Sequence, residues 1–160
     1  MRTVAPRRVG HTYRQQLVAP PGQVFPLLCP VRERDWARGW EPRLVVSASG
    51  LAETDCVFTT TEGAGEAVWY VTRHDPAGHF VEMIKITPGV TACRLDIRLE
   101  PAPGGCAATI SYTHTSLGPA GDAFVEAFTA ERYAAFMREW ERELNHYLAT
   151  GEKLPGETDP

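Results

Sequence analysis

Two side chains with acid–base chemistry stand two positions apart near the end of one predicted strand. Tyr112 and His114 close the run 106–114, in which small or apolar residues alternate with polar ones. Residues two apart in a strand point to the same face, so the phenol and the imidazole should share the inward face. Together they can act as acid, base or hydrogen-bond donor toward a ligand that carries a carbonyl group.

The same pair has a structural interpretation. Tyr112 would then pack against a helix, and His114 would meet a backbone carbonyl or solvent at the strand end. Buried titratable groups serve structure more often than catalysis. Both interpretations stay open here, and His114 is the best single candidate for a catalytic residue, with Tyr112 beside it.

Other catalytic signatures do not occur in the sequence. The four cysteines, Cys29, Cys56, Cys93 and Cys106, are too widely spaced for a CxxC pair, and no histidine stands at zinc-ligand spacing beside them. The sequence has no phosphate loop and no GxSxG nucleophile pattern. We therefore expect four free, mostly buried thiols, no metal site and no cofactor.

Length and composition narrow the class of protein. The chain has 160 residues, of which 43% are hydrophobic and 22% charged, as in an ordinary globular domain. The net charge of -4 and the absence of a basic run argue against a nucleic-acid partner. No apolar stretch resembles a secretory signal or approaches the roughly 20 residues of a membrane span, so we expect no membrane insertion and a cytoplasmic location.

Hydrophobic periodicity predicts the elements that must position Tyr112 and His114. A strand over 10–19 is followed by two short helices, over 20–28 and 31–37. Six β-branched and aromatic runs come next, separated by glycine-containing turns. Because the connections are short, we predict about seven antiparallel strands. The six later runs cover 43–49, 56–61, 67–73, 79–87, 91–100 and 107–116.

The last third of the chain is helical. Asp122 is the predicted amino-terminal cap, Thr129 marks a bend, and Gly151 ends the helix. Apolar residues recur every three or four positions and form one stripe. The stripe contains Phe124, Phe128, Tyr133, Phe136, Met137, Trp140, Leu144, Tyr147 and Leu148.

These elements predict an α+β fold in which a curved antiparallel sheet wraps a long carboxy-terminal helix. The aromatic stripe can be buried only against the face of the sheet. One helix is too thin to fill that hollow, so an apolar cavity should remain. We expect a tail over 1–9, one ligand-binding domain over 10–150 and a flexible tail over 151–160.

Two segments carry a resemblance to a known family. The run from Cys29 to Trp40, CPVRERDWARGW, and the run from Phe136 to Tyr147, FMREWERELNHY, stand in this order of elements. With that order they resemble the START-like helix-grip superfamily (SRPBCC), which includes polyketide cyclase/dehydrase-like proteins. The resemblance covers about Gly10 to Leu148. It implies a pocket without specifying a reaction.

The resemblance also suggests which residues border the pocket. Trp36 and Trp40 fall where helix-grip proteins commonly have the pocket entrance, as an aromatic wall for a flat ligand or as anchors for the short helices. Arg73 or Glu82 can orient a polar ligand head, or both can be ordinary exposed charges. We expect apolar contacts from Trp69, Ile97, Ile110, Phe136 and Trp140.

Three functions follow from this pocket. The leading one is binding or carrying a small hydrophobic molecule, such as a lipid, polyketide or aromatic metabolite. The second is a cyclase/dehydratase-type enzyme that uses Tyr112, His114 and Arg73. The third is a protein-interaction module like the chaperone activators of the superfamily, which ranks last because the outward positions Thr109 and Ser111 are polar. The ligand and the oligomeric state do not follow from the sequence.

Overall fold

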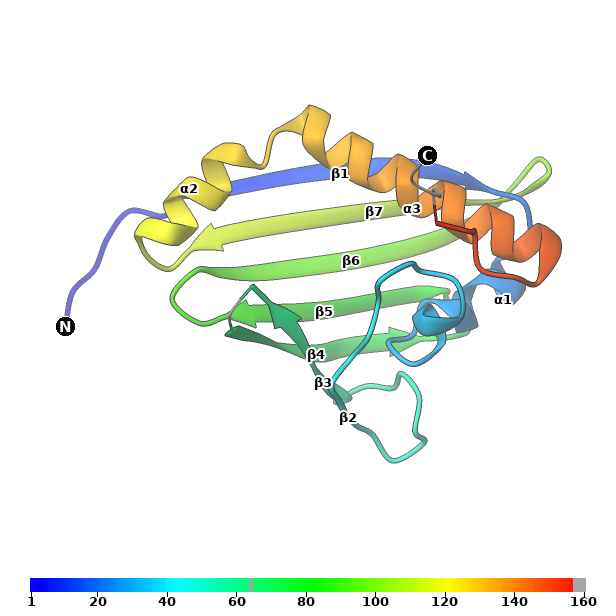
Figure 1. Ribbon diagram of the computed structural model, residues 1–160, viewed down its shortest axis with the longest axis horizontal. Helices are drawn as coiled ribbons and strands as arrows, with labels where there is room; N and C mark the ends of the chain where they lie inside the picture. Colours follow the sequence, from blue (N-terminus) through cyan, green and yellow to red (C-terminus); the bar gives the residue numbers. More distant parts are fainter. Residues whose placement is uncertain (64, 157–160) are drawn as a thin grey trace.

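This computed structural model describes residues 1–63 and 65–156. Its strands form one seven-stranded antiparallel sheet (Figure 1). The spatial order is β1-β7-β6-β5-β4-β3-β2, so each strand lies beside its neighbour in sequence except β1, which pairs with β7. The predicted count and pairing are thus confirmed. The strands are β1 (Arg8–Leu17), β2 (Leu44–Val46), β3 (Val57–Glu62), β4 (Gly65–Asp75), β5 (Phe80–Thr87), β6 (Thr91–Ala102) and β7 (Gly105–Ser116).

Side-chain alternation along β6 places one face of the sheet in the core. Cys93, Leu95, Ile97 and Leu99 are buried, while the intervening arginines are exposed. The register carries the same face across to β7, where Leu95 stands opposite Tyr112. The inward placement predicted for Tyr112 and His114 on β7 is therefore confirmed.

Two short helical segments follow β1, as predicted. α1 (Pro21–Val24) passes directly into the 3-10 helix η1 (Phe25–Leu27), and a second 3-10 helix, η2 (Arg32–Asp35), comes after it. The proline at position 26 removes a backbone donor and limits the first segment to short turns. The indole of Trp36 is fully buried and donates to the carbonyl of Leu27 at 3.0 Å, which holds the two segments together.

Two helices close the chain and are separated by a break. α2 (Pro119–Ala127) ends before Thr129, whose hydroxyl accepts from the amide of Arg132 at 3.2 Å and caps α3 (Ala130–Thr150). The predicted bend is confirmed. The predicted cap at Asp122 is wrong, because the helix already begins at Pro119; Asp122 lies in its first turn and accepts from Ser116 Oγ at 2.7 Å.

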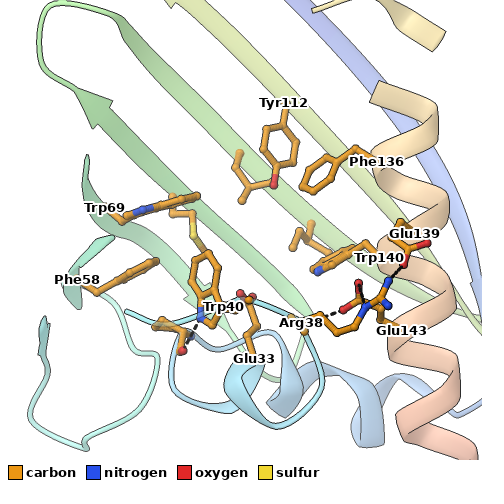
Figure 2. Close-up of a pocket in the computed structure, with 16 residues that line it drawn as sticks. Glu33, Arg38, Trp40, Phe58, Trp69, Tyr112, Phe136, Glu139, Trp140 and Glu143 are labelled. Carbon is orange, nitrogen blue, oxygen red and sulfur yellow. Dashed lines mark hydrogen bonds and ion pairs between the residues drawn. The ribbon is translucent and has the colours of Figure 1, made fainter. Parts of the chain in front are cut away.

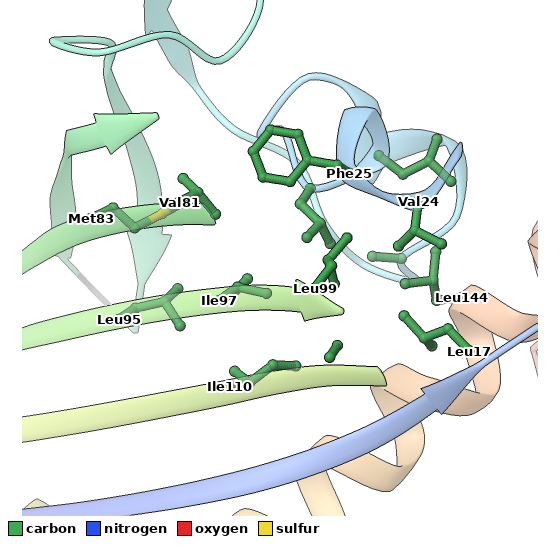
Figure 3. Close-up of a cluster of buried hydrophobic side chains, with 14 of the residues drawn as sticks. Leu17, Val24, Phe25, Val81, Met83, Leu95, Ile97, Leu99, Ile110 and Leu144 are labelled. Atoms are coloured by element: carbon green, nitrogen blue, oxygen red, sulfur yellow. The ribbon is translucent and has the colours of Figure 1, made fainter. Parts of the chain in front are cut away.

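α3 lies over the side of the sheet formed by β1 and β7 (Figure 1). Gln15 in β1 donates to the carbonyl of Met137 at 2.9 Å, and Tyr133 donates to the carbonyl of Ile110 at 2.5 Å. Side chains from the sheet, α1 and α3 form an apolar core at one end of the molecule (Figure 3). The helix is thereby fixed to one half of the concave face, and the segment between β1 and β2 covers part of the other half.

The strand nearest the open edge is shorter than predicted. β2 has three residues rather than the expected seven. The following residues turn instead, because the carboxylate of Glu53 accepts from the amides of Ala48 and Ser49 at 2.5 and 3.1 Å. Among the described residues, no helix is long and apolar enough to cross a lipid bilayer.

Candidate functional site

A cavity of about 200 Å³ lies between the concave face of the sheet, the segment containing η2, and α3 (Figure 2). Strands β3 to β7 supply one side, and α3 supplies the other. Six aromatic and four charged residues are among the residues that line the cavity. The aromatic residues are Trp40, Phe58, Trp69, Tyr112, Phe136 and Trp140; the charged ones are Glu33, Arg38, Glu139 and Glu143.

One wall is a cluster of three rings. Phe58 and Trp69 stand opposite each other on β3 and β4 and stack at 5.2 Å between centroids. Trp40 meets both rings edge-on, at 6.2 and 6.0 Å. Each indole N–H is already used, since Trp40 donates to Pro30 O at 2.8 Å and Trp69 to Thr60 Oγ1 at 2.9 Å. This wall therefore offers ring surface rather than hydrogen-bond donors.

The opposite wall comes from α3. Phe136 and Trp140 are four residues apart and so project from the same side of the helix. Phe136 meets Tyr112 edge-on at 6.1 Å, and Trp140 packs against buried Trp36 at 5.3 Å. The spacing of the aromatic stripe thus places two rings across the cavity from the three-ring cluster.

An ion-pair group ties the η2 segment to α3 at the rim. The backbone amide of Arg38 donates to Glu143 at 2.6 Å, and its guanidinium contacts both Glu143 and Glu139. Arg142 donates to Glu139 as well, at 2.8 and 3.1 Å, and these hydrogen bonds are the main reason that the pKa of Glu139 is lowered. Glu139 is therefore ionised, and Glu139 and Glu143 are both paired with arginine.

Glu33 differs from the other charged lining residues. Its carboxyl group accepts no hydrogen bond from the described residues, and desolvation raises its pKa to about 8. The side chain is half-buried, and Figure 2 shows it directed from the short-helix segment toward the labelled rings. At neutral pH the group is mostly a neutral carboxylic acid inside the cavity.

Tyr112 supplies the second unpartnered polar group of the cavity. Burial, followed by the neighbouring Cys93 and Glu33, raises the pKa of its phenol well above the ordinary value. Its hydroxyl makes no hydrogen bond within residues 1–63 and 65–156. The cavity thus combines an apolar wall with a phenol and a carboxyl group that are both free to meet a ligand.

The structure brings several of the predicted pocket residues together and leaves others elsewhere. Trp36 is fully buried behind Trp140, and Ile110 is fully buried in the core; neither belongs to the cavity lining. Neither side chain therefore reaches the cavity surface. The predicted residues that do line the cavity are Trp40, Trp69, Ile97, Tyr112, Phe136 and Trp140.

Arg73 and Glu82 also lie outside the lining. A bulge between Val71 and Arg73 shifts the register of β4, so Arg73 pairs with Glu82 instead of continuing the inward set. The Arg73 guanidinium lies 4.8 Å from the Phe80 ring centroid, and Glu82 accepts from Thr72 Oγ1 at 2.9 Å. The exposed-charge interpretation is the one that their placement fits.

His114 is enclosed by aromatic rings away from the cavity lining. It is 4% exposed and meets Phe124 and Phe128 edge-on at 4.7 and 4.6 Å. Nε2 lies 3.8 Å from Cys93 Sγ, while the buried Nδ1 has no partner in the described structure. Burial, with a smaller contribution from Lys85, lowers its pKa to about 4, so the imidazole is neutral.

The charged lining residues were not predicted. Glu33 stands in the charged run Arg-Glu-Arg-Asp, a pattern typical of an exposed turn. Helical spacing offers no signal either, because η2 ends at Asp35 and residues 36–40 are not helical.

The cavity lining contains no cysteine among the described residues. All four cysteines are buried free thiols, as expected. Over the part of the chain that the structure describes, no three His, Cys, Asp or Glu side chains gather in a way that could hold a metal ion.

The outward face of β4 and β5 carries exposed apolar residues, unlike the polar outward positions of β7. Val68 and Tyr70 on β4 and Ile86 on β5 are 41%, 43% and 37% exposed. Val68 and Ile86 are paired, so these residues share the convex face of the sheet. The polar residues of β7 alone do not represent that face.

The architecture around this cavity defines the class of protein: a curved antiparallel sheet gripping a long carboxy-terminal helix is the helix-grip fold of the START-like (SRPBCC) superfamily. The chain belongs to the family described as "Polyketide cyclase / dehydrase and lipid transport", whose model matches residues 9–145. Comparison with curated protein sequences gives no significant match. Family membership supports binding of a hydrophobic ligand or cyclase-type chemistry.

Solved structures share the fold at low sequence identity. Truncated norcoclaurine synthase from Thalictrum flavum has a TM-score of 0.66 at 16% identity, covering 94% of this chain and 98% of its own. A protein from Rhodobacter sphaeroides scores 0.61 at 21% identity, with 88% and 92% covered. Ara h 8.0201 scores 0.63 at 15% identity, with 89% and 99% covered. These likenesses establish the fold alone.

Proposed function

We propose that this protein binds a small hydrophobic, ring-containing molecule in the cavity between its sheet and α3. The observation that carries the proposal is the wall of six aromatic side chains around an open space of about 200 Å³. Sites for drug-sized ligands usually measure about 300–1,000 Å³, so a ligand of one or two rings suits this one.

The composition of the wall supports a flat, apolar ligand. Both indole N–H groups of the three-ring cluster are already hydrogen-bonded, so Trp40 and Trp69 present faces and edges rather than donors. Aromatic rings gain about 0.5–1.5 kcal/mol from offset or edge-on partners beyond the area they bury. An aliphatic chain would forgo that contribution.

A second candidate function is cyclase/dehydratase-type catalysis in the same cavity. Tyr112 and Glu33 both line the cavity without a hydrogen-bonded protein partner. The phenol can polarise a ligand carbonyl by donating a hydrogen bond, and the ionised form of Glu33, whose pKa is about 8, can accept a neighbouring proton. This version replaces the predicted role of His114, which lies outside the lining, with Glu33.

Native mass spectrometry of freshly purified protein tests the binding proposal directly. We expect a stoichiometric extra mass that disappears on denaturation, or, for an empty protein, saturable binding of naphthalene in saturation-transfer NMR. Ala37→Leu, which places extra carbon atoms in the cavity, should abolish that binding. Ala77→Leu, on an exposed turn, is the matched control and should bind normally.

Absence of both the bound mass and naphthalene binding would refute the proposal. Unchanged binding by Ala37→Leu would show that the probe occupies another place. The enzymatic alternative gains support if the protein accelerates deuterium uptake by 4-phenylbutan-2-one from heavy water and Tyr112→Phe removes that acceleration. A carrier would bind this ketone without exchanging its protons.

A further inference from the structure

Glu33 is the one charged side chain of the described cavity lining that lacks an ionic or hydrogen-bonded partner. Arg38 is engaged by Glu143 and Glu139, and Glu139 is also held by Arg142. Glu33, by contrast, shows no ion pair and accepts no hydrogen bond from residues 1–63 or 65–156. The cavity therefore contains one carboxyl group whose partner must come from water or from a ligand.

The lining offers no unengaged cation to an anionic ligand. Its single positive side chain within the described residues, Arg38, already contacts two carboxylates. Lys85 lies on the same face of the sheet but outside the lining, and Glu62 holds it while its ammonium sits 5.0 Å from the Trp69 ring centroid. A ligand carboxylate or phosphate would thus meet Glu33 and the rim carboxylates without a free counter-charge.

The aromatic wall also favours a cationic ligand over an anionic one. The faces of tryptophan, tyrosine and phenylalanine rings carry negative electrostatic potential and attract cations by about 0.5–2 kcal/mol, most strongly where water is excluded. Trp40 and Trp140 line the same cavity as Glu33, on its two walls (Figure 2). A positive group beside Glu33 would therefore contact ring surface as well as a carboxylate.

We infer that the cavity binds a small arylalkylamine, whose ammonium group pairs with Glu33 and whose ring lies between the three-ring cluster and α3. The inference rests on the proposed function and specifies its ligand class. The ammonium supplies the missing partner of Glu33, the rings enclose the apolar body, and the cavity volume limits the ligand to one or two rings.

Binding of an ammonium must change the protonation of Glu33. The empty site holds the carboxylic acid below pH 8, and a neighbouring cation stabilises the carboxylate. The proton leaves Glu33 for solvent as the amine enters, so affinity should rise with pH until about 8 and then level off. The groups around Glu33 are Tyr112 on β7, Arg38 in the covering segment and Glu139 and Glu143 on α3. The pKa of Tyr112 is raised and that of Glu139 is lowered, so both shifts lead away from this pH range.

Three probes of one shape but different charge test the ligand class: 2-phenylethylamine, 2-phenylethanol and 3-phenylpropionate. Tryptophan fluorescence titrations above pH 8 should give the amine at least tenfold tighter binding than the alcohol, with the propionate weakest. Glu33→Gln should reduce the affinity for the amine to that for the alcohol. Glu41→Gln removes the same charge from an exposed side chain outside the lining and should behave like the wild type.

A second readout follows the proton itself. Calorimetry of 2-phenylethylamine at pH 7 in buffers of different ionisation enthalpy should show release of about 0.9 proton per ligand, as expected for a group with a pKa of about 8 that ionises on binding. The alcohol should release none. Glu33→Gln should abolish the release.

The outcomes separate this inference from the function on which it rests. If naphthalene binds but the amine binds no tighter than the alcohol, the cavity takes apolar ligands and the amine inference is wrong. Retention of the amine preference by Glu33→Gln would overturn it equally. If neither naphthalene nor any of the three probes binds, the proposed function fails as well.

Discussion

His114 and Glu33 sit in two regions on the same side of the sheet and share one unusual property. Each is a titratable group with an unpaired polar atom, and burial is the main cause of its shifted pKa. Desolvation disfavours the charged form in both cases, so the imidazole loses its proton and the carboxyl group keeps its own. Both are neutral at pH 7, yet only one of them faces an open space.

The difference lies in how the surrounding rings are arranged. At the closed end, the break between α2 and α3 brings Phe124 and Phe128 against His114, and the region around the imidazole is filled. At the cavity, Trp40 and Trp140 stand on opposite walls and leave room between them. A shifted pKa alone therefore does not identify a functional residue; accessible space beside the group is also required.

The largest expected effect is a difference between Phe128→Ala, which should lower stability, and Phe136→Ala, which should weaken ligand binding. Phe128→Ala removes a ring that contacts His114, His11 and Tyr133, and should lower the free energy of unfolding by roughly 2–4 kcal/mol while leaving ligand affinity in the cavity unchanged. Phe136→Ala removes a lining ring that is 50% exposed, and should cost under about 1 kcal/mol while weakening naphthalene binding about tenfold.

Urea unfolding and NMR titration of both variants measure the two effects. Equal loss of stability, or equal loss of binding, would remove the distinction between a filled region and an open one. Phe124→Ala, at the closed end but at a ring that is 40% exposed, should cost less stability than Phe128→Ala and leave naphthalene binding unchanged.

Glu33 should make the protein less stable as the pH rises. Its pKa is about 8 in the folded state and ordinary in the unfolded chain, so the folded state retains a proton that the unfolded chain releases. The contribution of protonated Glu33 to the free energy of unfolding is then fully present below pH 4.5 and is lost as the pH rises through 8. Relative to Glu33→Gln, the free energy of unfolding of the wild type should fall by roughly 2–3 kcal/mol between those two pH values. This is less than the full value of about 1.4 kcal/mol per pKa unit, because water in the cavity partly solvates the carboxylate.

Unfolding curves of the two proteins at several pH values check this directly. If the free energies of unfolding of the two proteins change equally with pH, Glu33 is well solvated and burial does not raise its pKa. An amine ligand at saturation should suppress the difference, because it stabilises the ionised carboxylate.

His114 should show the smallest effect, in the opposite pH window. Its folded pKa of about 4 lies below the ordinary 6.5, so the unfolded chain binds a proton that the folded state excludes. The contribution is present above pH 6.5 and is lost as the pH falls through 4. Relative to His114→Leu, the wild type should lose roughly 1–2 kcal/mol on acidification, allowing for local opening that hydrates the imidazolium.

The same variant tests whether the closed end matters for the ligand. His114→Leu fills a similar volume without the unpaired Nδ1 and should bind naphthalene as the wild type does. A tenfold loss of binding would place His114 at the functional site after all and restore the acid–base pair with Tyr112.

Much of the architecture could be predicted because it depends on local periodicity. Alternation along residues 106–114 predicted which side chains face inward, and the stripe along 124–148 predicted which face of the helix meets the sheet. Short turns specified antiparallel neighbours. These patterns are set by the backbone geometry of strands and helices, which is the same wherever the element lies.

The polar chemistry of the cavity depended on contacts between distant segments. One extra residue at the bulge after Val71 turned Arg73 away from the inward face, since a shift of one position reverses every later side chain. The pairing of Arg38 with α3 and the isolation of Glu33 likewise arise where residues about a hundred positions apart meet. The sequence by itself determined the sheet, the gripping helix and an aromatic-lined space between them. Only the tertiary structure decided which titratable group is sealed by packing and which one faces that space, because desolvation depends on every neighbour in three dimensions.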